Sequence, residues 1–229
     1  MALFQLTSEI IFPPPFLADE NGLLAFGGDL QPARLVAAYR SGIFPWFSPG
    51  DPILWWFLNP RLVLFLEEFK VSRRLTRELR SSRFRVTFDQ AFEQVMASCA
   101  QVRLEKGEGT WISKEMLAAY CRLHDLGYAH SVECWQGEVL AGGLYGIALD
   151  RIFFGESMFT RVSNGSKVAL AALVSRLKST GFQLIDCQMT TRHLVSFGAR
   201  EIAGTEFLDQ LQSFIQTTVP DGKWCDDRF

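Results

Sequence analysis

The 229-residue sequence lacks the long apolar run that a membrane-spanning helix needs. Its longest nearly apolar stretch, 139–149, is too short to cross a bilayer and contains three glycines. The first ten residues have no basic region and include Glu9, which argues against a signal peptide. These absences predict a soluble, cytoplasmic protein.

Residues arranged for metal binding are also missing. The five cysteines form no CxxC pair, and the closest two, Cys121 and Cys134, are 13 positions apart. The three histidines, at positions 124, 130 and 193, show no metal-ligand spacing. The motifs GxSxG, HExxH, GxGxxG and the P-loop are absent as well. We therefore expect reduced thiols and no structural zinc site.

An excess of positive charge is absent too, since the formal net charge is −2, which excludes a globally basic nucleic-acid binder. The basic residues concentrate instead in one segment, 70–85, where Glu78 is the only acid. This basic stripe consists of Lys70, Arg73, Arg74, Arg77, Arg80, Arg83 and Arg85. Its partly helical spacing suits a phosphate backbone, and the alternative is a solvated helix face that pairs with acids elsewhere.

Aromatic residues are abundant, with 20 Phe and 6 Trp. Some of these rings are candidates to line a pocket or to stack on a ligand, and core packing is the alternative for each. Trp46 and Trp111, which both lie in glycine- or proline-rich surroundings, are the candidates for stacking on a base.

The chain changes character near residue 60. Residues 1–60 hold most of the prolines and three tryptophans, which predicts a small N-terminal domain with Pro/Gly/Trp-rich loops. Residues 61–229 alternate between strand and helix patterns, which predicts an α+β domain with a central mixed, largely antiparallel sheet. The expected strands are 62–66, 84–88, 129–135, 139–148, 151–157 and 183–188, and the expected longer helices are 89–101, capped by Asp89, 113–127 and 164–180.

A strand that ends in polar residues is the main candidate for chemistry. Side chains alternate along a strand, so Asp186 and Gln188 are expected on one face and Cys187 on the other. A carboxylate and an amide on one face can orient an amine and a carbonyl oxygen together. Glu156 ends another strand in apolar surroundings, where a carboxylate is costly unless it is paired or used. A structural hydrogen-bond network is the alternative for all three.

Six segments together resemble the leucyl/phenylalanyl-tRNA–protein transferases. They are 21–30 (NGLLAFGGDL), 39–47 (YRSGIFPWF), 54–56 (LWW), 109–112 (GTWI), 155–159 (GESMF) and 184–188 (LIDCQ). The resemblance extends over nearly the whole chain in the same order. It implies a small N-terminal domain followed by a GNAT-like acyltransferase domain, with no metal and no cofactor. The implied reaction moves Leu or Phe from aminoacyl-tRNA to the N-terminus of a protein that begins with Arg or Lys, and so marks that protein for N-degron degradation.

The resemblance also implies roles for residues. Asp186 and Gln188 would position and polarise the reacting groups with support from Glu156, and Trp46 and Trp111 would hold the terminal adenosine. The basic stripe would contact the tRNA backbone. The apolar pocket for the Leu or Phe side chain would consist of Phe153, Met158, Leu170, Leu173 and Ile185. A flexible Met and a purely apolar pocket discriminate weakly, so some Met transfer is expected as well.

Three features leave alternatives open. Thr191 stands where better-known members of the family often have Asn. A coenzyme A-dependent N-acetyltransferase would share the fold, but its pyrophosphate loop would correspond to 161–166 (RVSNGS), where Asn164 and Ser166 replace small residues. A non-catalytic RNA-binding module would use the basic stripe and the aromatics, but it leaves the pair of Asp186 and Gln188 without a role.

Overall fold

The computed structural model describes residues 3–220 and 222–224 and contains two β-sheets. The larger sheet has seven strands in the order β11-β5-β10-β9-β8-β7-β6, and only β9 and β10 run parallel to each other. Its strands are β5 (Arg61–Phe65), β6 (Arg85–Phe88), β7 (Ala129–Gln136), β8 (Val139–Leu149), β9 (Ile152–Thr160), β10 (Leu184–Gln188) and β11 (Arg200–Ile202). The predicted α+β class with a mixed, largely antiparallel sheet is confirmed.

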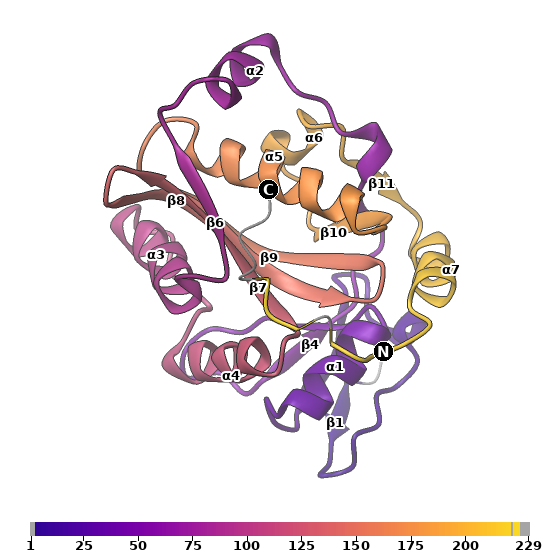
Figure 1. The fold of residues 1–229 in the computed structure, drawn as a ribbon. Helices are drawn as coiled ribbons and strands as arrows, with labels where there is room; N and C mark the ends of the chain where they lie inside the picture. The colour runs from indigo at the N-terminus through magenta and orange to yellow at the C-terminus, as the bar shows by residue number, and fades with distance from the viewer. Residues whose placement is uncertain (1–2, 221, 225–229) are drawn as a thin grey trace.

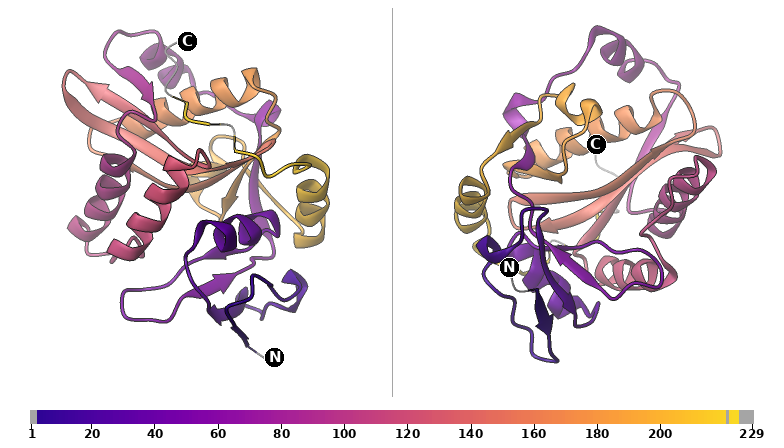
Figure 2. Two further views of the ribbon diagram at one scale, coloured as in Figure 1. Left: turned by 60° about the horizontal axis from the view of Figure 1, so that its bottom comes forward. Right: turned by 180° about the vertical axis from the view of Figure 1, so that it is seen from behind.

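Helices cover both faces of the larger sheet (Figures 1 and 2). The α5 helix (Gly165–Ser179) packs on one face, and α3 (Phe92–Glu105) and α4 (Lys114–Asp125) pack on the other. Strand alternation supplies both cores, since Phe153 belongs to the α5 side while Ile152 and Phe154 belong to the opposite side. The remaining helices are α2 (Arg73–Leu79), α6 (Arg192–Val195), α7 (Gly204–Phe214) and a 3-10 turn at Leu66–Glu68.

The N-terminal part forms a sheet of its own at one end of the molecule, at the bottom of Figure 1. Its strands are β1 (Phe4–Leu6), β2 (Leu23–Gly27), β3 (Phe44–Pro45) and β4 (Leu54–Trp56), and it carries the α1 helix (Pro32–Arg40) and a 3-10 turn at Pro15–Leu17. The sequence predicted loops here, because strands this short and this rich in Pro and Gly lack a readable period. Their buried residues join the α3 and α4 side of the core. A domain boundary at residue 60 stays a prediction.

Asp89 does not cap the helix that the sequence assigned to it. It has a left-handed φ of 55°, and α3 begins only after Ala91. The carboxylate instead accepts hydrogen bonds from the Ser131 amide at 2.8 Å and the Trp224 amide at 2.6 Å, and contacts His130 Nδ1 at 2.8 Å. A capping residue and a tertiary hydrogen-bond acceptor look alike in sequence, since both are an Asp before a helical pattern.

Candidate active site

The larger sheet opens where its two parallel strands separate. Strand β10 pairs with β9 over only three residues, Leu184 to Asp186, whereas β9 continues beside β8 as far as Thr160. A cavity of about 640 Å³ lies at this separation. Its walls come from β8, β9, β10, α5, the loop after α3 and the N-terminal segment at Phe44 to Trp46.

Two β-bulges determine which side chains reach the cavity. In β9 the pairing with β8 passes from Gly155 to Ser157, so Glu156 is the extra residue. In β10 the pairing with β5 passes from Asp186 to Gln188, so Cys187 is the extra residue. A bulge reorients its side chains and breaks the strict alternation of a strand.

The bulge in β10 changes the predicted orientation of its polar pair. Cys187 and Gln188 both line the cavity, whereas Asp186 is fully buried and lies outside the lining. Gln188 has a left-handed φ of 53°, and its backbone N–H donates to Asp186 Oδ1 at 3.1 Å. Asp186 therefore supports Gln188 from behind instead of facing the cavity beside it.

Asp186 is held by a buried arginine. Arg61 Nε donates to Oδ1 at 2.8 Å and Nη2 donates to Oδ2 at 2.7 Å, and both side chains have zero exposed fraction. The rings of Phe44, Phe57 and Phe207 surround the guanidinium at 4.6–6.0 Å. A two-pronged ion pair enclosed by rings fixes the carboxylate rigidly.

Two tyrosines hold Glu156 at the cavity wall. Tyr39 of α1 donates to Oε1 at 2.8 Å, and Tyr120 of α4 donates to Oε2 at 3.0 Å. The two hydroxyl oxygens also lie within hydrogen-bond distance of each other, so the two tyrosine protons are shared among three contacts. Burial raises the pKa of Glu156 to about 7, although the tyrosine hydrogen bonds oppose that rise. The carboxyl group can therefore gain or lose a proton near neutral pH.

One end of the cavity is apolar. Phe153, Met158, Leu170, Leu173 and Ile185 all line it, so the five residues that the sequence proposed as a side-chain pocket lie together. Four of them are buried and Met158 is partly buried. The surface they present is suited to a hydrocarbon or aromatic side chain.

The two candidate tryptophans stand at the cavity wall. The Trp46 and Trp111 rings lie with their centroids 6.5 Å apart at an interplanar angle of 85°, and both are partly exposed. The Arg103 guanidinium lies 4.5 Å from the Trp111 ring centroid, and its Nε donates to the Gly109 carbonyl at 3.3 Å. Two partly exposed aromatic faces beside an apolar cavity suit a nucleobase.

Gln188 and Thr191 complete the polar part of the cavity lining. Gln188 Nε2 is buried and has no hydrogen-bond partner in the part of the chain that the structure describes, so it is free to donate to a ligand. Thr191 Oγ1 accepts from the Leu194 amide at 3.2 Å and caps α6. Asn caps a helix as well as Thr does, so the difference from the better-known sequences preserves this local structure.

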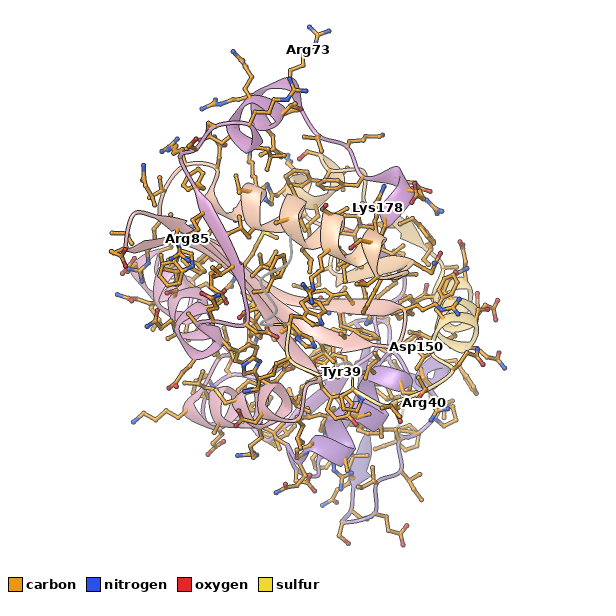
Figure 3. The ribbon with its side chains drawn as sticks, viewed as in Figure 1. Tyr39, Arg40, Arg73, Arg85, Asp150 and Lys178 are labelled. Carbon is orange, nitrogen blue, oxygen red and sulfur yellow. The ribbon has the colours of Figure 1, made fainter. Side chains whose placement is uncertain are left out.

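The basic stripe lies away from the cavity. Ser72 caps α2, whose first residue Arg73 projects outward from the top of the molecule (Figure 3). The seven cations are exposed, and among the described residues only Arg83 of this group forms an ion pair, with Glu78 at 3.2 Å. Glu78 also accepts from Asn164 at 3.0 Å, which connects α2 to the loop before α5.

The loop before α5 is packed tightly against β8. A Cβ atom added to Gly142 would lie 2.6 Å from the Gly165 backbone, and one added to Gly165 would lie 2.7 Å from the Ala141 carbonyl. The Gly165 amide donates to the Val162 carbonyl at 2.9 Å. At least this first amide of α5 is therefore already used within the protein.

Sequence reasoning missed three residues that hold the site. Arg61, Tyr39 and Tyr120 are distant in sequence from the carboxylates they contact. Arg61 directly precedes an apolar strand, and this was the available signal, because an arginine there requires a buried partner. The two tyrosines gave no sequence signal of a role at the site, since their spacing along apolar helices fits core packing equally well.

Two features are absent from the described residues. No helix among them is long and apolar enough to cross a membrane. Within the same part of the chain, no cluster of three or more His, Cys, Asp or Glu residues could hold a metal ion.

Comparison with known proteins identifies close relatives. The family model described as leucyl/phenylalanyl-tRNA protein transferase matches residues 63–212, and the model for the N-terminal domain of the same family matches residues 28–57. The leucyl/phenylalanyl-tRNA–protein transferase of Syntrophobacter fumaroxidans is 56% identical over 224 residues, which cover 98% of this chain and 96% of that protein. The protein of the same name from Desulfotalea psychrophila is 52% identical, with coverages of 98% and 99%.

Solved structures show a weaker likeness. A GCN5-related N-acetyltransferase from Kribbella flavida aligns with a TM-score of 0.41 and 10% identity, over 75% of this chain and 61% of that chain. An aminoglycoside acetyltransferase from a soil metagenome, solved with sisomicin, aligns with a TM-score of 0.39 and 11% identity, over 64% of this chain and 94% of that chain. Neither carries an inference about the reaction of this chain.

Proposed function

Because the chain belongs to the leucyl/phenylalanyl-tRNA protein transferase family, we propose that it transfers Leu or Phe to the N-terminal α-amine of proteins that begin with Arg or Lys. The chain is an aminoacyltransferase and its donor is an aminoacyl-tRNA. The added residue would mark the acceptor for N-degron degradation. Since the donor is charged tRNA, the reaction belongs in the cytoplasm.

The reaction itself exchanges an ester for an amide. The neutral α-amine attacks the carbonyl carbon of the ester between the amino acid and the tRNA. A C–N bond forms, the C–O bond breaks, and one proton passes from the nitrogen to the departing ribose oxygen. The ester is already activated, so the protein has to supply proximity, orientation and a route for the proton.

The observation that carries the proposal is the cavity where β9 and β10 separate. It joins an apolar end, two aromatic faces, an unpaired amide donor and a carboxylate with a pKa near 7 in one space. These are the groups that an amino-acid side chain, a terminal adenosine, an ester carbonyl and an amine require.

The apolar end would receive the Leu or Phe side chain of the donor. Phe153, Leu170, Leu173 and Ile185 form buried walls, and the thioether of Met158 can adapt to branched or flat shapes. A pocket of this kind separates similar apolar side chains by only about 10–200-fold, so Met should be transferred at a lower rate.

Gln188 would orient the ester carbonyl through its free Nε2 donor. Asp186 would act as a positioning residue, because it accepts a hydrogen bond from the Gln188 backbone N–H at 3.1 Å. It is paired with Arg61 and does not line the cavity. This role supports the chemistry without direct contact with the substrate.

Glu156 would take the proton from the attacking amine. Its pKa of about 7 places a useful fraction in the carboxylate form at neutral pH, and Tyr39 and Tyr120 fix both of its oxygens. The pKa values of both tyrosines are raised by burial, so they remain neutral donors at physiological pH.

The outer contacts would hold the rest of the two substrates. Trp46 and Trp111 would contact the terminal adenosine, and the basic stripe would bind the tRNA backbone. Glu108, an exposed carboxylate at the cavity wall, is placed to attract the cationic side chain of an acceptor that begins with Arg or Lys.

Labelled transfer tests this proposal directly. Radiolabelled Leu, Phe or Met on tRNA is offered with a peptide that begins with Arg, and with the same peptide acetylated at its N-terminus. Transfer to the free amine alone, with Leu and Phe above Met, is the expected result. Acetylation from acetyl-coenzyme A without transfer from tRNA would overturn the proposal in favour of an N-acetyltransferase.

A second arm addresses a purely RNA-binding role. Gln188→Ala removes the free amide and leaves the basic stripe and the tryptophans unchanged. We expect normal affinity for charged tRNA and at least a tenfold loss of transfer. Equal losses of binding and transfer would contradict a role for Gln188 in the reaction.

A further inference from the structure

The chain crosses back over the molecule after α7, toward α5 (Figure 1). Asp150, at the turn between β8 and β9 (Figure 3), accepts from the amides of Gln216 and Thr217 at 2.8 and 3.2 Å. Tyr128 donates to the Thr218 carbonyl at 2.9 Å. Gly127 lies so close to this segment that an added Cβ would meet the Gly222 backbone at 2.8 Å. The segment is therefore docked in a defined path.

This path ends with a buried tryptophan. The Trp224 side chain is inserted into the core on the α5 side of the sheet, and the residue is only 5% exposed. Its amide donates to Asp89 Oδ2 at 2.6 Å, and its ring stacks on His130 with centroids 3.9 Å apart and planes at 7°. The Arg176 guanidinium lies 4.8 Å from the ring centroid.

A further contact of this ring connects it to the active site. The Phe153 and Trp224 ring centroids are 5.9 Å apart at an angle of 31°, and Phe153 is fully buried. Phe153 also lines the cavity, whereas Trp224 does not. Phe153 thus forms a wall of the cavity, and Trp224 supports that wall from behind.

We propose that Trp224 is a positioning residue that sets the size of the amino-acid pocket by preventing Phe153 from retreating into the core. The proposal rests on the proposed function, since it concerns the pocket for the donor's side chain. Protein interiors are close-packed, so an aromatic wall residue without support behind it moves into the space that opens. A retreating Phe153 would deepen the pocket and weaken its contacts with small side chains.

The consequence concerns selectivity. Leu would lose van der Waals contacts in a deepened pocket, while a donor side chain as large as Trp would gain room. The effect on a Phe donor would lie between the effects on Leu and Trp donors. The adenosine contacts would be unaffected, because Trp46 and Trp111 pack on the opposite side of the sheet, and the cations of the basic stripe are exposed.

The experiment compares Trp224→Ala, Trp224→Phe and the wild type. One tRNA is charged chemically with Leu, Phe or Trp, and kcat/KM for transfer to an Arg peptide is measured for each. The ratio of two donors does not depend on the fraction of enzyme that is folded, so a general loss of stability cannot change it. We expect the Trp-to-Leu ratio to rise about tenfold in Trp224→Ala and to stay near the wild-type value in Trp224→Phe.

The controls make each outcome decisive. Leu211→Ala creates a cavity in α7, away from the pocket, and should lower stability without changing the ratio. If Trp224→Ala does not fold, Trp224→Leu gives the same comparison with a smaller expected rise. An unchanged ratio in the variant that folds would overturn the inference. Absence of transfer by the wild type would instead overturn the proposed function.

Discussion

The structure gives the Glu156 carboxyl group a pKa close to neutral pH, so both of its protonation states are accessible. Burial favours the neutral acid, and the two tyrosine donors favour the carboxylate, which leaves the pKa at about 7. The balance requires residues from α1, α4 and β9 at once. A proton acceptor near neutral pH is therefore a product of the tertiary structure and not of its local sequence.

The first prediction concerns the pH dependence of transfer. With Glu156 as the proton acceptor, kcat/KM should fall as the pH decreases through about 7, because the carboxyl group becomes protonated. Glu156→Gln should remove this limb, keep only the separate limb that deprotonation of the acceptor's own α-amine gives near pH 8, and lower kcat/KM by about 10²–10⁴. A Gln variant that retains the same limb would show that another group takes the proton.

The same residue makes a prediction about stability. A carboxyl group whose pKa is raised by folding contributes stability that is present below about pH 4.5 and is lost as the pH rises through about 7. Glu156→Gln should therefore raise Tm relative to the wild type at pH 8, and the difference should shrink toward pH 4.5. Thermal unfolding at several pH values measures it, and a difference that does not change with pH would contradict the assignment.

Asp186 and Arg61 raise a separate question at the residue scale, which is whether the carboxylate acts chemically or by position. Asp186→Asn leaves a buried arginine without its charge partner and should cost about 3–5 kcal/mol of stability. The variant should lose activity and keep the pH limb of the wild type, because we propose that this limb reports the titration of Glu156. Loss of the limb in the folded variant would assign proton transfer to Asp186 instead.

At the scale of elements, α2 is a short helix that presents cations to solvent. Its single buried side chain, Leu75, anchors it, and the Glu78 to Asn164 hydrogen bond joins it to the loop before α5. The helix contributes no residue to the cavity. Its arginines can therefore affect the affinity for tRNA without touching the reacting groups.

This separation predicts a particular kinetic signature. Arg73→Ala combined with Arg77→Ala should raise KM for charged tRNA, leave kcat unchanged and reduce the salt dependence of log KM by roughly one unit per lost phosphate contact. The matched control is Arg122→Ala combined with Arg151→Ala, two exposed arginines outside the stripe. Equal effects in the two double variants would indicate a general charge effect.

At the scale of the whole molecule, the sequence predicted the larger sheet better than the site. Strands between 129 and 160 have clear apolar patterns and short turns, and they appear as β7, β8 and β9. The orientation of Asp186 was not predictable, because alternation holds only until a bulge, and the bulge at Cys187 depends on pairing with β5. The short N-terminal strands and β11 lacked enough residues to show a period.

The site itself joins the two sheets. Phe44, Pro45 and Trp46 line the cavity from the N-terminal part, and Tyr39 reaches Glu156 from α1. The segments that resemble the family contain about half of the cavity lining, and Phe153, Leu170 and Leu173 lie outside them. They did not predict Arg61 as the partner of Asp186, because that contact bridges 125 positions of sequence.

The burial of Trp224 behind Phe153 also has a consequence for synthesis. A ribosome adds residue 224 after every residue that lines the cavity. A nascent chain can therefore form the cavity before Trp224 is present to support Phe153. The enzyme would then acquire its full donor selectivity only when the segment that carries Trp224 has left the exit tunnel. A premature stop codon before position 224 would leave a protein with all its reacting groups and a different choice of amino acid.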